Sequence, residues 1–233
     1  HAHAGSHLLD VGPVASVVAF LGAFAADLRD ATGTPIRELS PGGGVGVAYL
    51  PDERAPSVAD YAAVVTRALA EVTRRHRLAP PRLVVEPGRA IVARAGVALY
   101  TTGPRKTVSG GTTFLAVDGG MGDNPRPALY GAGYWAALAE HLTAPPDETV
   151  RVVGRYCESG DVLVERVTLP RAARGDILAI PVSGAYHLPM ASNYNLLARP
   201  AVVFVRDGHA RLVRRRETLD DLLRLEEDAS EPR

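Results

Sequence analysis

The feature that most constrains the fold is a change in the character of the chain at Gly96. Before this residue, amphipathic segments of helical length alternate with short apolar segments, and after it β-branched runs are separated by Gly, Pro, Asp and Asn. Alternating helices and strands are typical of a parallel α/β architecture, whereas short β-rich runs between turn residues favour an antiparallel β domain. The sequence therefore predicts an α/β unit over residues 1–95 and a β domain over residues 96–233.

Two helices are expected in the α/β unit. Residues 13–31 begin with Pro and end with polar residues, as helices often do. Residues 57–76 are amphipathic, and Ser57 followed by Asp60 predicts an N-terminal cap. Short strands are expected after Gly33 and from residue 81, the second of them buried. The tail, residues 217–228, predicts a short closing helix.

The composition excludes several classes of protein. The chain has 233 residues, of which 46% are apolar and 22% charged, and its formal net charge is zero. No strong field attracts nucleic acid or an acidic membrane, and no apolar run reaches the length of a membrane span. A single Cys excludes an internal disulfide framework and indicates a reducing compartment. We therefore expect a cytoplasmic protein without nucleic-acid or membrane partners.

Two motifs of the α/β unit are suited to an anion. The stretch "SPGGGVG" at 40–46 follows a predicted strand, and successive glycines let backbone N–H groups approach an anion closely. A flexible turn is the alternative. The stretch "VVEPGR" at 84–89 places Glu86 and Arg89 just after a strand. They form either a simple ion pair or an acid for a ring nitrogen beside an Arg for an anion.

One stretch of the β domain holds several residues that suit a functional site. In "VDGGMGDNPRPALY" at 117–130, Asp118 ends a predicted strand, Arg126 lies between two prolines and Tyr130 follows closely. Proline stiffens the backbone around the Arg. A turn alone requires Gly and Pro but neither this Arg nor this Tyr, so the motif favours a functional site.

Two further stretches of the β domain are polar. "CESGD" at 157–161 places the only Cys, Cys157, beside Glu158. A lone Cys is most often a small buried apolar residue, but a neighbouring acid and a Gly turn also suit a presented thiol. "SGAYHLPMASNYN" at 183–195 predicts a loop too polar for the core. Its notable side chains are Tyr186, Asn193 and Tyr194.

The first residues, "HAHAGSH", combine three histidines with Gly-Ser. A zinc site and a cleavage scar are both compatible with this composition. No cluster of Cys or acidic residues at zinc spacing supports a metal, and short histidine motifs are weak indicators. We expect no metal site.

Six stretches together resemble the diaminopimelate decarboxylases, which are fold-type III pyridoxal-phosphate (PLP) decarboxylases. In chain order they are "HAHAGSH", "GGGVG", "EPGR", "VDGGMGDNPRPALYGAGY", "CESGD" and "GAYHLPMASNYN". The resemblance covers nearly the whole chain. It implies a partial TIM-type (β/α) barrel followed by an antiparallel β-barrel or sandwich domain, and a homodimer whose active site is shared across subunits.

The resemblance also implies that residue 1 lies midway along the barrel, after the strand whose Lys forms the Schiff base with PLP. Lys106 is the only Lys of this sequence, and its neighbours Gly, Pro and Arg indicate a surface residue among turns. A half barrel exposes strand edges and apolar faces. The chain by itself is therefore expected to be poorly soluble and inactive.

The resemblance implies a PLP site built mostly from the first unit. His3 is expected to stack on the cofactor ring and to count among the catalytic residues. Glu86 is expected to pair with the pyridine nitrogen and keep it protonated. The remaining cofactor contacts that the resemblance implies are Ser6, Gly44, Gly88, Arg89 and Tyr186.

The same resemblance implies decarboxylation of meso-2,6-diaminopimelate to L-lysine and CO2, a step of lysine biosynthesis. Arg126 and Tyr130 are expected to bind the distal carboxylate of the substrate, and Glu158 its distal amine. Cys157 is expected to donate a proton in the active site of a partner subunit, and Asp118 to orient that site. The substrate contacts implied are Arg89, Arg126, Tyr130, Glu158 and Tyr186.

Two alternatives stay open at this point. One is a related decarboxylase or epimerase of the same fold that acts on another amino acid. The other is a non-catalytic remnant that binds PLP or a partner without turnover.

Overall fold

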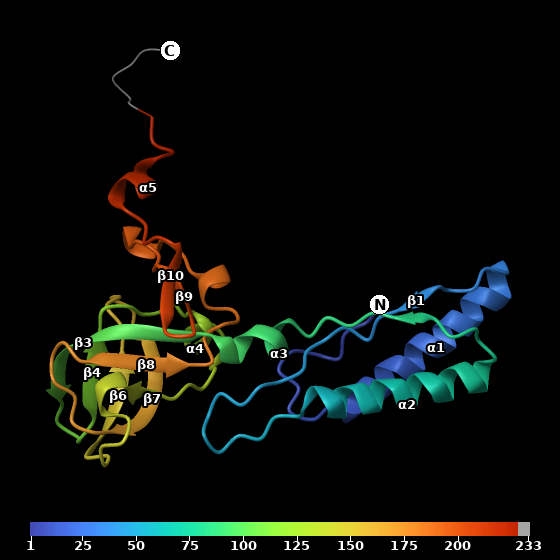
Figure 1. Ribbon diagram of the computed structural model, residues 1–233, viewed down its shortest axis with the longest axis horizontal. Coiled ribbons are helices and arrows are strands. Elements are labelled where there is room, and N and C mark those ends of the chain that lie inside the picture. The colour runs from blue at the N-terminus through green and yellow to red at the C-terminus, as the bar shows by residue number, and fades with distance from the viewer. Residues whose placement is uncertain (228–233) are drawn as a thin grey trace. The chain divides into compact units, whose positions relative to one another are not determined.

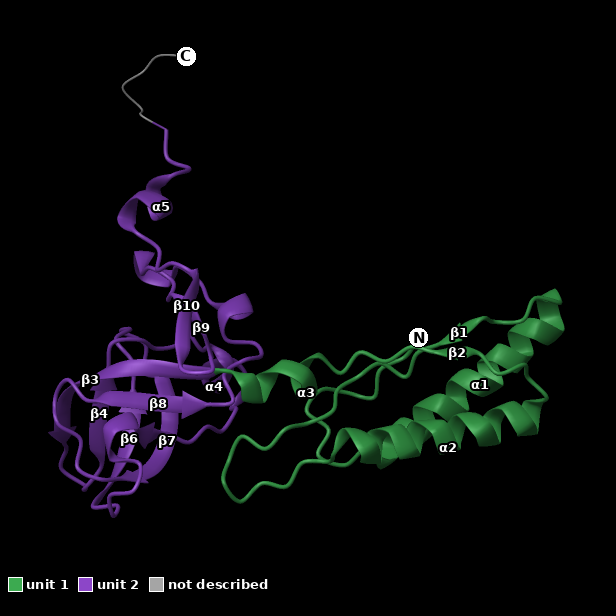
Figure 2. Cartoon of the chain, viewed as in Figure 1, with its two compact units in different colours: residues 1–96 green, residues 97–233 purple. Residues whose placement is uncertain are grey.

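The computed structural model describes residues 1–227 and divides the chain into two compact units, His1–Gly96 and Val97–Arg233 (Figure 2). The division falls beside Gly96, where the character of the sequence changes. Each unit has its own buried residues and is described separately. No helix within residues 1–227 combines the length and the apolar character that crossing a membrane requires.

Two long helices dominate the first unit and lie side by side (Figure 1). They are α1, Gly12–Thr32, and α2, Val58–His76, which confirms both predicted helices. The predicted cap is also present: Ser57 Oγ accepts from the N–H of Asp60 at 3.0 Å, and Asp60 Oδ2 accepts from the N–H of Ser57 at 2.8 Å. Both backbone donors are thereby satisfied at the start of α2.

The two helices pack closely because one of them carries a glycine at the contact. A Cβ at Gly22 of α1 would lie only 1.8 Å from Cγ1 of Val72 of α2. Around this contact the apolar faces of both helices are buried, which stabilises the unit by removing apolar surface from water. The buried residues of this core are Val11, Val14, Val18, Val45, Tyr61, Val65 and Val72.

Parallel segments connected by the helices form the rest of the first unit. Strands β1, Glu38–Leu39, and β2, Arg82–Leu83, pair in parallel. Parallel bridges from Leu8 to Val45 and from Gly43 to Glu86 extend the pairing. The order of segment, helix, segment, helix, segment supports the predicted α/β architecture.

One prediction for this unit was wrong. The strand at residue 82 is not buried, since Arg82 is exposed and Leu83 half-buried. Within residues 1–227, β1 is the only strand that pairs with β2, so its other edge is uncovered. The unit then ends with α3, Gly88–Val92, and the 3-10 helix η1, Ala93–Ala95. Apolar side chains such as Phe20 and Ile91, 68% and 70% exposed, agree with the expected apolar faces.

The second unit contains a curled six-stranded sheet (Figure 1). Its strands, in the order in which they pair, are β5 (Ala137–Leu138), β8 (Ile177–Pro181), β3 (Val97–Thr107), β4 (Thr113–Val117), β6 (Glu148–Val153) and β7 (Val162–Leu169). The fully buried large side chains on these strands are Leu115, Leu138, Val150, Val152, Leu163, Val164, Leu178 and Ile180.

The sheet is mixed, whereas the sequence predicted an antiparallel one. Strands β4 and β6 pair in parallel, with Leu115 opposite Val152, and the other pairs are antiparallel. Parallel neighbours need a long crossover connection. Residues 118–147 provide it, and they include the helix α4, Arg126–Tyr130, and the 3-10 helix η2, Ala139–His141.

The remaining elements follow the sheet. The polar loop contains the 3-10 helices η3, Leu188–Met190, and η4, Tyr194–Leu196. Strands β9, Val202–Arg206, and β10, His209–Arg214, form an antiparallel hairpin. The closing helix α5, Leu219–Leu223, begins after its cap Thr218 and is shorter than the predicted 217–228, of which residue 228 lies outside the described residues.

Candidate functional site

The glycine cluster of the first unit brings its backbone into close contact with neighbouring segments. Gly42 and Gly44 have φ angles of 77° and 79°, in the region that favours glycine. A Cβ at Gly42 would lie 2.6 Å from Nδ1 of His3, and a Cβ at Gly44 would lie 2.0 Å from the carbonyl oxygen of Gly5. The imidazole of His3 therefore packs against the glycine backbone, as the position of these motifs on adjacent parallel segments allows.

Glu86 lies at the end of the next parallel segment. Its Oε1 is 3.2 Å from Nε2 of His1 and accepts a hydrogen bond from Ser40 Oγ at 3.3 Å. The side chain is 54% exposed. Tyr61 donates to the carbonyl oxygen of Gly42 at 3.0 Å, and burial, followed by the charge of Glu86, raises the pKa of the Tyr61 hydroxyl. The carboxylate is thus held beside the glycine cluster by polar neighbours.

Arg89 is the charged centre of this group and is only 7% exposed. Its Nη1 donates to the Tyr49 hydroxyl at 2.7 Å, and its Nη2 donates to Ser6 Oγ at 2.8 Å. The Arg89 guanidinium carbon is 5.7 Å from the Tyr49 ring centre. Behind Tyr49, His7 packs edge-on at 5.3 Å and donates from Nε2 to the Val47 carbonyl at 3.0 Å. A guanidinium next to hydroxyls is a donor set that suits a phosphate.

Gly88 lies directly before Arg89 at the start of α3. A Cβ at this position would meet nothing within 4 Å, so open space adjoins the residue. Its N–H donates to the carbonyl oxygen of Glu86 at 2.9 Å. The first unit therefore brings together His3, Ser6, Gly44, Glu86, Gly88 and Arg89, the residues of this unit for which the resemblance implied a cofactor site.

In the second unit, Arg126 is buried within an aromatic cluster. Its Nη1 donates to the Tyr134 hydroxyl at 2.6 Å, and the same hydroxyl lies 3.1 Å from Nε2 of His187. Tyr186 faces the guanidinium at 5.9 Å, and Tyr130, one turn further along α4, is exposed. The geometry brings Tyr186 to Arg126 and adds Tyr134 and His187, to which the sequence analysis gave no role.

The polar loop is therefore not wholly outside the core, which corrects the prediction for residues 183–195. His187 is only 6% exposed because the Tyr134 hydroxyl satisfies its ring nitrogen. Burial, and then the charge of Arg126, lower the pKa of His187 to about 4. The imidazole is accordingly neutral at neutral pH.

Cys157, Glu158 and Tyr194 form a second cluster of this unit. The Cys157 thiol is exposed and lies 3.7 Å from Glu158 Oε1, so the alternative of a buried apolar Cys does not hold. The Tyr194 hydroxyl donates to the same oxygen, which lowers the pKa of Glu158, and the ring stacks on Tyr156 at 5.7 Å. Glu158 Oε2 is buried and has no hydrogen-bond partner within residues 1–227.

Asp161 fixes the position of this cluster. It accepts from the N–H of Met121 at 2.6 Å and from the N–H of Tyr156 at 2.8 Å, and thus connects two of the predicted motifs. Burial raises the pKa of the Asp161 carboxyl. Asp118, by contrast, accepts from the N–H of Thr101 at 2.8 Å, which fastens the end of β4 to β3.

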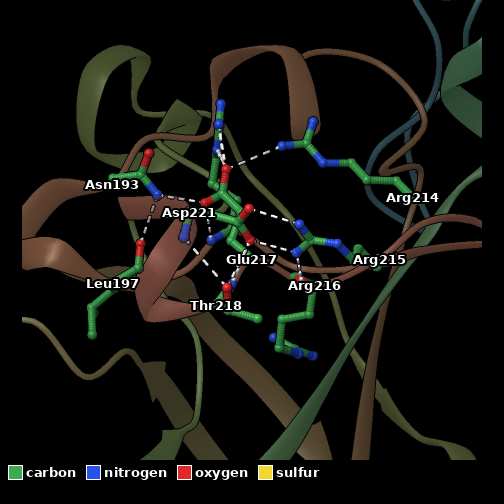
Figure 3. A network of polar contacts seen from close by, with 9 residues as sticks. Asn193, Leu197, Arg214, Arg215, Arg216, Glu217, Thr218 and Asp221 are labelled. Carbon is green, nitrogen blue, oxygen red and sulfur yellow. Dashed lines mark hydrogen bonds and ion pairs between the residues drawn. The ribbon is translucent and has the colours of Figure 1, made fainter. Parts of the chain in front are cut away.

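A network of ion pairs anchors the loop that carries Tyr194 (Figure 3). Asn193 donates to the Leu197 carbonyl at 3.0 Å and to Glu217 Oε2 at 2.6 Å. Arg199 binds Glu217 through both Nε and Nη2, and this contact lowers the pKa of Glu217 to about 2. A cavity of about 400 Å³ adjoins the network, and of the predicted loop residues Asn193 lines it. Asn193 therefore has a structural role.

Lys106 lies within β3, opposite Phe114, and is exposed. The prediction of a surface residue is confirmed, but the residue belongs to a strand and not to a turn. Among residues 1–227 there is no group of three His, Cys, Asp or Glu side chains that could hold a metal ion.

Sequence reasoning missed several residues that support the predicted ones. They are single Tyr, Ser, His or Asp residues whose role depends on packing, and all of them except Tyr49 lie inside stretches that the sequence analysis had quoted without giving these residues a role. The missed residues are Ser40, Tyr49, Tyr134, Asp161 and His187.

The chain is similar to proteins of one family over nearly its whole length. The family model described as the C-terminal sheet domain of pyridoxal-dependent decarboxylase matches residues 24–184. The diaminopimelate decarboxylase of Synechocystis is 44% identical over 225 residues, which are 96% of this chain and 48% of that protein. That of Actinosynnema pretiosum is 48% identical over 229 residues, which are 97% of this chain and 50% of that protein.

Solved structures show the same relationship. The crystal structure of diaminopimelate decarboxylase from M. jannaschii matches with a TM-score of 0.87 at 32% identity, covering 98% of this chain and 51% of that one. The Helicobacter pylori enzyme complexed with L-lysine matches with a TM-score of 0.82 at 34% identity, over 96% of this chain and 53% of that one. The chain thus spans about half the length of the relatives that it matches. It belongs to the family of pyridoxal-dependent decarboxylases.

Proposed function

We propose that the chain is the C-terminal half of a diaminopimelate decarboxylase, which converts meso-2,6-diaminopimelate to L-lysine and CO2 with PLP as cofactor. The observation that carries the proposal is the match to relatives of that name at 40–48% identity over 96–97% of the chain. The stretches that gave the resemblance also supply clusters whose chemistry suits a phosphate, a carboxylate and an amine.

The first unit fits PLP. Arg89 and Ser6 present nitrogen and hydroxyl donors, Gly44 brings its backbone close, and Gly88 leaves open space beside them. These residues would hold the phosphate, and His3, which already packs against the glycines, would face the ring. Glu86, now in contact with His1 and Ser40, would pair with the pyridine nitrogen. When bound, PLP supplies a conjugated ring that accepts the electron pair left by the departing CO2.

The second unit supplies groups for both charged ends of the distal part of the substrate. Arg126 would bind the distal carboxylate through its planar guanidinium, with the exposed Tyr130 and Tyr186 beside it. Glu158 would bind the distal ammonium group, because its buried Oε2 has no hydrogen-bond partner within residues 1–227. A buried carboxylate oxygen without a donor is costly, and an ammonium group would satisfy it.

Cys157 would supply a proton. Its thiol is exposed beside Glu158, and we propose that it acts in the active site of a partner subunit of a homodimer. Asp118, which fastens the end of β4, would help to orient this shared site. Arg89 would also contact the substrate.

Residues 1–95 would form part of a TIM-type barrel and residues 96–233 the β domain that follows it. The single Cys of the chain supports a cytoplasmic location.

The proposal is tested with a chimera, in which this chain replaces the matching half of the Synechocystis diaminopimelate decarboxylase. The purified chimera is loaded with PLP and supplied separately with meso-diaminopimelate, L-ornithine, L-arginine and L-lysine. We expect CO2 release and L-lysine formation from diaminopimelate, and little reaction with the other three. A soluble, PLP-loaded chimera that prefers ornithine or arginine would favour a related decarboxylase, and one without any turnover would favour a binding remnant.

A further inference from the structure

Arg126 is enclosed by aromatic side chains from other parts of the second unit. Its guanidinium carbon lies 5.6 Å from the ring centre of Tyr134 and 5.9 Å from that of Tyr186. Arg126, Tyr134 and His187 are 6%, 3% and 6% exposed. The cluster holds a positive charge away from water, and such a charge is tolerated only with well-directed hydrogen bonds.

Which group donates in each hydrogen bond of this cluster follows from the chemistry of Arg126. A guanidinium can only donate, so the Tyr134 oxygen accepts from Arg126 Nη1 at 2.6 Å. The hydroxyl proton of Tyr134 then points away from Arg126, and His187 Nε2 lies 3.1 Å from the same oxygen. The arrangement is satisfied when the imidazole is neutral, with Nε2 accepting and the proton on Nδ1.

The surroundings of His187 favour this neutral form. Burial, and then the charge of Arg126, lower the pKa of His187 to about 4. A second proton would place another positive charge beside the guanidinium and turn Nε2 into a donor. The Tyr134 oxygen would then face two donors, Arg126 Nη1 and His187 Nε2.

The backbone next to His187 is in an unfavourable conformation that its surroundings must hold. Tyr186 has a φ of 64°, which is unfavourable for a residue with a Cβ. Such conformations persist where surrounding contacts fix them. The buried bond of His187 is one such contact, and it fixes the loop from which the Tyr186 ring faces Arg126.

We propose that His187 and Tyr134 are positioning residues, which fix the guanidinium of Arg126 and thereby set the preference for ligands with a distal carboxylate. The inference rests on the proposed function, in which Arg126 binds that carboxylate. Neither residue needs to touch the substrate. Tyr134 restricts rotation of the guanidinium, and His187 orients the hydroxyl of Tyr134.

The test compares L-lysine with cadaverine, two ligands that differ only in the carboxylate. Their affinities are measured by calorimetry for the PLP-loaded chimera of the preceding test, both unsubstituted and with Tyr134→Phe or His187→Ala. We expect Tyr134→Phe, which loses a hydrogen bond to a charged group, to bind L-lysine about tenfold more weakly, and His187→Ala to weaken L-lysine binding in the same direction. Cadaverine binding stays unchanged.

Two further variants separate positioning from general destabilisation. His187→Gln restores L-lysine binding relative to His187→Ala, because the amide oxygen can accept from the Tyr134 hydroxyl. Thr149→Val is the matched control, since it removes another side-chain hydroxyl bond, the 3.1 Å contact between Thr149 and Thr168 across β6 and β7. Thr149→Val leaves both affinities unchanged.

The outcomes distinguish this inference from the proposed function. If both variants keep the preference for L-lysine, the inference is wrong and the proposed function stands. If the unsubstituted protein shows no preference for L-lysine, the proposed function is wrong and the inference fails with it. Nitrogen-15 NMR of the unsubstituted protein gives a readout that needs no variant: a proton on Nε2 of His187, in place of Nδ1, overturns the inference.

Discussion

Replacement of Gly44 by Ala is expected to disrupt the proposed cofactor site through a single methyl group. At a φ of 79°, a residue with a Cβ pays roughly 1–2 kcal/mol for the left-handed conformation. The new Cβ would also lie 2.0 Å from the carbonyl oxygen of Gly5, so the segment that carries His3 and Ser6 must move. Overpacking of this kind costs about 1–3 kcal/mol more.

Gly33→Ala is the matched control for this substitution. Gly33 has a similar φ of 72°, but a Cβ there would meet nothing within 4 Å. Gly33→Ala is therefore expected to lose only the roughly 1–2 kcal/mol of stability that the left-handed backbone costs a residue with a Cβ. The difference between the two variants therefore isolates the close approach of Gly44 to Gly5.

Two measurements on the same samples check the reasoning. Denaturant unfolding followed by circular dichroism gives the free energy of unfolding, and equilibrium dialysis gives the affinity for PLP. We expect Gly44→Ala to lose about 2–5 kcal/mol in total and to bind PLP at least tenfold more weakly. Gly33→Ala should lose less stability and keep its PLP affinity. Equal losses in both variants, or unchanged PLP binding in Gly44→Ala, would refute the argument.

Three further predictions follow from single contacts. Tyr49→Phe removes the hydroxyl that accepts from Arg89 and should weaken PLP binding about tenfold in dialysis, with little change in the thermal unfolding midpoint. The pKa of Glu217 is about 2 in the folded chain, below its ordinary 4.5, so its contribution to stability is complete above pH 4.5 and declines as the pH falls towards 2. Glu217→Gln should therefore flatten this part of the stability profile, and an unchanged acid profile would contradict the ion pair with Arg199. Asp161→Asn leaves one of two backbone N–H groups without a good acceptor and should lower the free energy of unfolding by about 1–3 kcal/mol. The substitution should also change the alkylation rate of the Cys157 thiol. An unaltered rate would argue against the role of Asp161 in positioning Cys157.

Local sequence rules predicted the helices of the first unit well. The Ser57 cap with Asp60 and the apolar spacing of residues 13–31 act within one helix, so they can be recognised without tertiary information. The exposure of β2 was mispredicted, because an apolar run does not show how many strands will pair with it. The parallel pairing of β4 with β6 was likewise missed, since it depends on the crossover through residues 118–147.

Some residues of the candidate site could likewise be recognised from the sequence, and others could not. Gly44, Glu86 and Arg126 were recognisable because their motifs combine unusual residue types within a few positions. Tyr49 could not be recognised, because its role depends on the fold placing its hydroxyl beside Arg89, which is distant in sequence. Tyr134 could not be recognised either, because its role depends on the fold placing its hydroxyl beside Arg126. The exposed thiol of Cys157 was one of two open alternatives, and burial decided between them.

The central claim is that this chain holds PLP through the cluster around Arg89, and that its only lysine is not the residue that forms the Schiff base. The most direct measurement incubates the purified protein with PLP, reduces the mixture with borohydride and maps any modified peptide by mass spectrometry, with PLP binding measured before reduction. The account predicts saturable PLP binding that is lost in Arg89→Met, and no covalent adduct at the exposed Lys106. A stoichiometric adduct at Lys106, or PLP binding unaffected by Arg89→Met, would contradict it.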